Sequence, residues 1–90
     1  MIPDDMTKEE FSQAVVDLAR EMRALLAERP PSVQGAVLAD LLAIWLVGYV
    51  TSSTAETEKL RNALLTMHID KVRELIPVNE ANFRAQGLIP

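Results

Sequence analysis

The stretch Gln34–Val50, QGAVLADLLAIWLVGYV, is apolar around almost its whole circumference when it is wound as an α-helix. Its single charged residue is Asp40. A helix that is apolar on all sides has to be covered on all sides. Two neighbouring helices from a chain of 90 residues can cover only part of such a cylinder. The stretch therefore predicts that something outside the monomer covers this helix.

Composition places the chain among small all-α proteins. Its 90 residues suffice for one domain, 1–90, near the size at which a single core is only marginally sufficient. Hydrophobic residues make up 49% of the chain but aromatic residues only 4%, so we expect an aliphatic core. Ala, Leu, Met and Glu favour helices over strands because they lose little rotamer freedom in a helix.

Charge and residue types argue against several functions. A formal net charge of −4 opposes nucleic-acid binding, which depends on neutralising phosphates. The lack of cysteine and of a visible secretory signal fits a cytoplasmic location. We expect no metal, no other cofactor and no enzyme activity. One histidine without cysteine does not match the familiar zinc spacings, and the three glycines are too scattered to form a phosphate loop.

Start and stop signals predict helices at 7–29, 32–51 and 53–76. Thr7 and Glu10 fit a capping box at the first start. Prolines after the first and third segments predict their ends, and the tail 77–90 could hold a further short helix. Short connections predict an antiparallel three-helix bundle, or helical hairpin unit, that associates as a helical homodimer.

Two interpretations explain what covers the second helix: a second copy of the chain, or a lipid bilayer. We favour the homodimer, since a central Asp40 would cost about 2.5–3.5 kcal/mol in a membrane and the amphipathic first and third helices would lose their partner. A single-span membrane protein through 33–50 stays an alternative. The residues predicted at the dimer interface or core are Ala36, Val37, Ala39, Leu41, Ala43, Ile44, Trp45 and Gly48.

Three polar residues are candidates for a site. The simplest interpretation places Asp40 at the rim of the packed surface and His68 in the core with a hydrogen-bond partner. A functional interpretation makes them buried polar groups or ligand contacts, with Arg61 on the same side of the third helix as His68.

The favoured function is a non-enzymatic interaction or structural protein that acts as an obligate homodimer. Its solvated faces, or the tail around Phe83, could bind a further protein that the sequence does not identify. The alternative is a small-molecule-binding module with an inter-helical pocket near His68 and Trp45.

Overall fold

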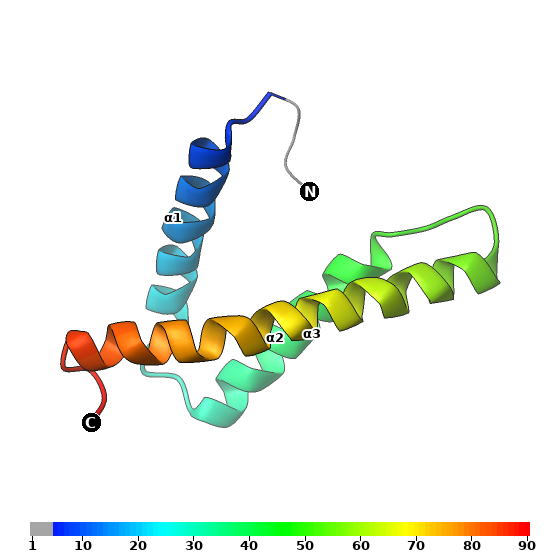
Figure 1. Cartoon of the computed structure of the whole chain (residues 1–90). Helices are drawn as coiled ribbons and strands as arrows, with labels where there is room; N and C mark the ends of the chain where they lie inside the picture. The colour runs from blue at the N-terminus through cyan, green and yellow to red at the C-terminus, as the bar shows by residue number, and fades with distance from the viewer. Residues whose placement is uncertain (1–4) are drawn as a thin grey trace. The chain divides into compact units, whose positions relative to one another are not determined.

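The structure, a computed structural model, describes residues 5–90 and contains three helices (Figure 1). They are α1, Lys8–Leu26; α2, Pro31–Val47; and α3, Thr54–Ala85. Residues 5–90 contain no strand, which confirms the all-α class. The chain divides into two compact units, one ending at Leu38 and one beginning at Ala39, so the division falls within α2. The bundle, the dimer and the single domain stay predictions, and residues 1–4 of that domain lie outside the described residues.

Helix α1 begins as predicted and ends earlier than predicted. The Thr7 hydroxyl accepts a hydrogen bond from the backbone N–H of Glu10 at 3.1 Å, which is the expected N-cap. The helix ends at Leu26 rather than at Arg29, since Glu28 adopts a left-handed φ of 70°. The Gln34 side-chain amide then donates to the carbonyls of Leu26 and Arg29, each at 2.9 Å, and caps this end.

Helix α2 is shifted relative to the predicted 32–51. It begins at Pro31, because the fixed φ and missing N–H of proline suit the first position of a helix. It ends at Val47, where the N–H groups of Gly48 and Tyr49 bond three residues back, to Trp45 and Leu46, at 3.2 and 3.1 Å. This tighter turn ends the α-helical pattern before Thr51.

Helix α3 continues through Pro77, so the predicted end at 76 and the separate tail helix are wrong. At 100° per residue, Pro77 lies on the opposite side of the helix from Val72 and Leu75. Pro77 and Arg73 are both exposed, so water can bond the Arg73 carbonyl that Pro77 leaves without a donor. Beyond Pro77, an ion pair of 2.8 Å between Glu80 and Arg84 supports the helix. Gly87, at φ 72°, ends it.

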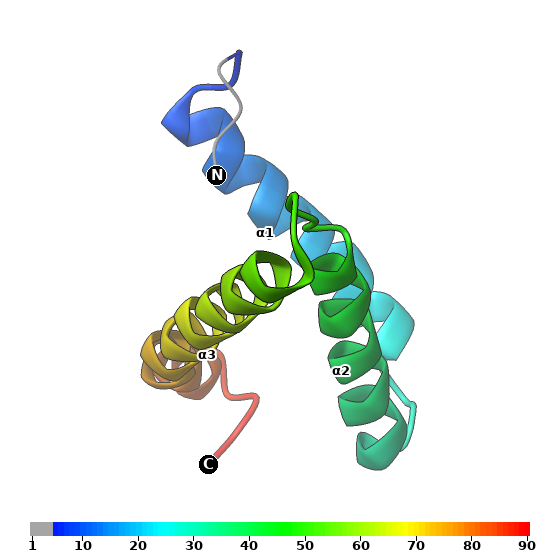
Figure 2. The same cartoon turned by 90° about the vertical axis from the view of Figure 1, so that its right-hand side faces the viewer.

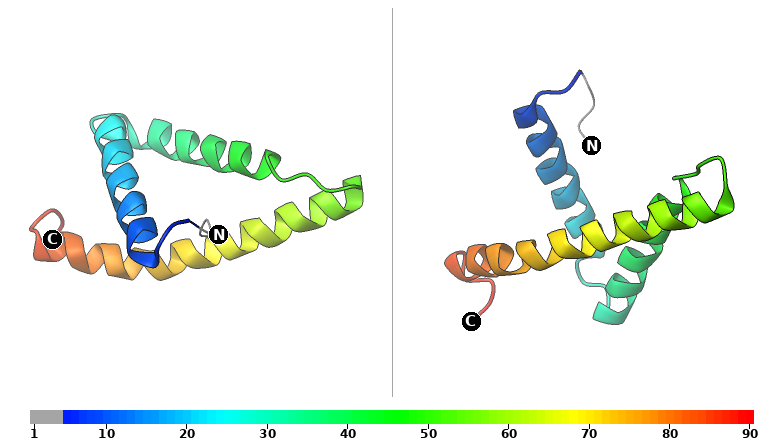
Figure 3. Two further views of the ribbon diagram at one scale, coloured as in Figure 1. Left: turned by 90° about the horizontal axis from the view of Figure 1, so that it is seen from above. Right: turned by 45° about the vertical axis from the view of Figure 1, so that its right-hand side comes forward.

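The second unit is a helical hairpin without a hydrophobic core. The loop 48–53 reverses the chain, so that the start of α3 lies beside the end of α2 (Figure 2; Figure 3). Among residues 5–90 only Thr57 is buried, at 8% exposure, and no apolar residue is. Large apolar side chains of the described residues therefore remain exposed to solvent.

Candidate functional site

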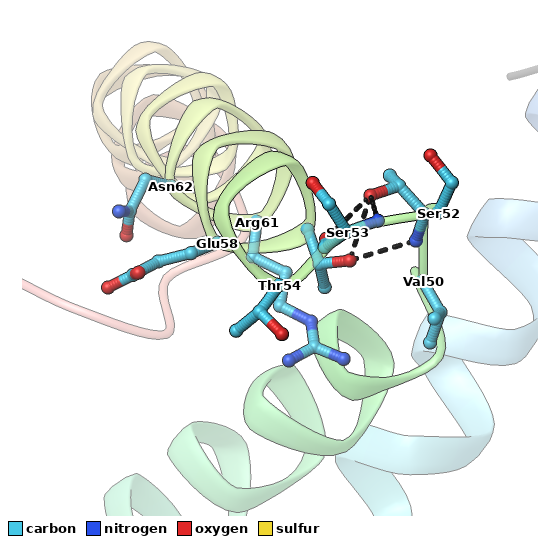
Figure 4. A pocket seen from close by; sticks show the side chains of 9 residues that line it. Val50, Ser52, Ser53, Thr54, Glu58, Arg61 and Asn62 are labelled. Atoms are coloured by element: carbon cyan, nitrogen blue, oxygen red, sulfur yellow. Dashed lines mark hydrogen bonds between the residues drawn. The ribbon is translucent and has the colours of Figure 1, made fainter.

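Arg61 joins the two helices of the second unit. Its Nε donates to the carbonyls of Leu46 and Tyr49, each at 3.0 Å, and its Nη2 donates to the carbonyl of Val47 at 2.9 Å. The last carbonyls of a helix lack partners within the helix and carry partial negative charge. Figure 4 shows Arg61 reaching from α3 to this end of α2, while Glu58 and Asn62 point away from it. Arg61 is therefore a helix cap supplied by the neighbouring helix.

An aromatic cluster lies next to this cap. The Trp45 ring meets Tyr49 edge-on, with centroids 5.2 Å apart at 79°, and lies 5.6 Å from the His68 ring at 43°. His68 nevertheless remains exposed, and Trp45 retains 43% of its surface. The expected core position of His68 is thus not reached in the single chain, because Trp45 alone does not cover the imidazole. Burial of His68 by a second copy stays a prediction.

Asp40 does not join this cluster. It is exposed, and its carboxylate makes no hydrogen bond or ion pair with residues 5–90. This position agrees with the simpler interpretation of a carboxylate that reaches water. Of the three polar candidates, the structure brings Arg61 and His68 to the end of α2 and leaves Asp40 apart.

The predicted interface residues on α2 are exposed in the single chain. The large side chains among them keep 39% to 61% of their surface. Ala36, Ala39 and Ala43 are exposed as well, and Gly48 lies one residue past the helix end. This face is available to a partner, and its role as an interface stays a prediction. The large side chains concerned are Val37, Leu41, Ile44 and Trp45.

An open hollow of about 660 Å³ lies at the loop between α2 and α3 (Figure 4). The Thr57 hydroxyl accepts from the Thr51 N–H at 2.9 Å, and the two threonine hydroxyls are also 2.9 Å apart. The Thr51 hydroxyl in turn donates to the Ser53 carbonyl at 3.0 Å. These polar groups satisfy one another and hold the loop, so they offer little to a ligand. Arg61 lines this hollow, whereas Trp45 and His68 do not.

Sequence reasoning missed two structural residues, Gln34 and Thr57. Thr57 precedes Leu60 and Leu64 at helical spacing, and this was the available signal that it faces inward. No local signal marks Gln34, because it caps a helix eight residues away.

Within residues 5–90, no helix combines the length and apolar character needed to cross a bilayer. The same residues contain no group of three acidic or histidine side chains placed to hold a metal ion. No protein-family model, curated protein or solved structure matches the chain.

Proposed function

We propose that the protein is a non-enzymatic interaction or structural protein that acts as an obligate homodimer. The observation that carries this proposal is the lack of any buried apolar residue among residues 5–90. Ordering the backbone costs about 1–2 kcal/mol per residue, and apolar burial is the main term that offsets it. A chain with 49% hydrophobic residues and no cysteine gains this burial by association.

The proposed partner at α2 is a second copy of this chain. A two-fold dimer places the same patch of both copies in contact, so one apolar helix face supplies both halves of the interface. The small side chains of Ala36, Ala39 and Ala43 would allow the two backbones to approach, while Leu41 and Ile44 supply apolar area.

The variant Leu41→Arg tests the proposal. Leu41 is 43% exposed in the single chain, so an arginine side chain at this position can extend away from its own chain. A dimer would cover the 43% of Leu41 that the single chain exposes, so the change removes about 1 kcal/mol of apolar burial from each copy and also buries a charge. We expect Leu41→Arg to sediment as a monomer, with reduced helix content, at concentrations where the unmodified protein is a folded dimer.

Thr66→Arg is the matched control, because Thr66 is exposed on the polar side of α3 and the change adds the same charge. It should leave the dimer intact. A Leu41→Arg dimer of undiminished affinity would contradict the proposed interface.

A further inference from the structure

Asp40 lies at the centre of one face of α2. At about 100° per residue, Val33 and Val47 lie almost directly in line with it, one before it and one after it. Ala36 and Ala43 flank this line on one side, each within about 60° of Asp40. We call these five residues the Asp40 face. Asp40 is central along the helix as well, since nine residues of α2 precede it and seven follow it.

The helix that shares a unit with each half of α2 leaves the Asp40 face open. The first unit contains α1 and α2 up to Leu38, and within it Val33 keeps 45% of its surface. The second unit contains α3 and α2 from Ala39, and within it Val47 keeps 62%. Asp40 itself is exposed. Within each unit the Asp40 face is therefore available to the proposed second copy.

Asp40 has no ion-pair partner among residues 5–90. It is the only charged residue of α2. On α3, Arg61 is held by three carbonyls at the end of α2, and His68 contacts the Trp45 ring. The described ion pairs, one within α1 and three within α3, join other residues. The charge that Asp40 would meet in a dimer through α2 is therefore the one on α2 of the second copy, which is again Asp40.

Two-fold symmetry brings a central residue next to its own copy. A residue on the axis of such a dimer contacts the same residue of the other chain. When two α2 helices run antiparallel and overlap along their whole length, the axis passes the middle of the helix. When they run parallel, each residue of the contacting face lies opposite itself. Asp40 is central along the helix and across the face, so either arrangement brings the two copies of Asp40 together.

We infer that the two Asp40 carboxylates meet across the two-fold axis and make the affinity of the dimer depend on pH. This inference rests on the proposed homodimer and adds its regulation. Two carboxylates at close range repel each other when both are ionised, so a proton shared between them stabilises the pair. In the single chain the carboxylate is exposed to water. Formation of the dimer therefore takes up a proton from solvent, and a rise in pH weakens the dimer.

Sedimentation equilibrium at about pH 5.5 and about pH 7.5, both above the sequence pI of about 4.8, tests the inference. A dimer that takes up one proton weakens about tenfold for each pH unit. We expect the Kd of the unmodified dimer to rise about tenfold to a hundredfold over this interval. Asp40→Asn keeps the shape of the side chain and removes its charge. Its dimer should be tighter than the unmodified dimer at the higher pH and should change much less between the two pH values.

Asp70→Asn is the matched control, because it removes the same charge from an exposed aspartate on α3. It should keep the pH dependence of the unmodified protein. Any contribution of His68, a residue type that changes charge in this pH range, is common to all three proteins. If Asp40→Asn shows the same pH dependence as the control, or a weaker dimer than the unmodified protein, the inference is wrong while the proposed homodimer stands. If none of the three proteins dimerises at either pH, both are wrong.

Discussion

Replacing Arg61 by methionine removes the cap that α3 supplies to α2 while it keeps an unbranched side chain in place. A hydrogen bond that involves a charged group contributes about 1.5–3 kcal/mol. The two partly buried bonds, to Leu46 and Tyr49, share the single hydrogen of Nε and count as one. The bond to Val47 is exposed, so water largely replaces it. We expect Arg61→Met to lower the free energy of unfolding by about 2 kcal/mol, a large part of the 5–15 kcal/mol typical of folded proteins.

Urea unfolding at fixed protein concentration measures this change. Circular dichroism follows the helices, and the fluorescence of Trp45, the only tryptophan, follows the end of α2. Arg61→Lys should lose an intermediate amount, because an ammonium keeps the charge but lacks the planar fork. Lys59→Met is the control, since Lys59 is exposed on α3, and it should change stability by less than about 0.5 kcal/mol. An Arg61→Met protein as stable as this control would refute the assigned cap.

Three further substitutions test other parts of the fold in the same assay. Gln34→Ala removes two hydrogen bonds to the end of α1 and should cost about 1 kcal/mol, whereas Gln13→Ala, which loses only an exposed bond to Asp17, should cost almost nothing. Thr57→Val leaves the Thr51 N–H without its acceptor and should lower the free energy of unfolding by about 1–2 kcal/mol. Thr57→Ser keeps the hydroxyl, so an equal loss of stability in both variants would show that the Thr57 hydroxyl does not hold the loop. Pro77→Ala restores a helical N–H and should raise the free energy of unfolding by about 1–3 kcal/mol without reducing the helix content seen by circular dichroism. A decrease in the free energy of unfolding or in the helix content would contradict a helix that continues through Pro77.

Local signals predicted the helices better than their ends. The start of α1 was predictable because Thr7 caps an N–H three residues away. The ends of α1 and α2 were not, because Gln34 and Arg61 cap them from eight and up to fifteen residues along the chain. The end of α3 was predicted wrongly from Pro77. Whether a proline ends a helix depends on whether the carbonyl four residues before it, here that of Arg73, can bond to water.

The candidate site was predictable only in part. Helical spacing placed Arg61 and His68 on the same side of α3, and the structure brings both to the end of α2. Their partners, the α2 carbonyls and the Trp45 ring, depend on how the loop positions one helix against the other. The exposure of His68 could not be predicted either. The apolar residues around it, Leu64, Leu65 and Val72, indicate that this helix face is covered, but they do not indicate whether the same chain covers it.

The molar mass of the untagged protein in detergent-free buffer tests the central claim most directly. Size-exclusion chromatography with light scattering would follow it over a dilution series into the submicromolar range. The proposed obligate homodimer predicts twice the 10.0 kDa of the chain, with helix content falling as dilution separates the copies. A folded protein of 10.0 kDa at every concentration, or one recovered only with detergent, would contradict it.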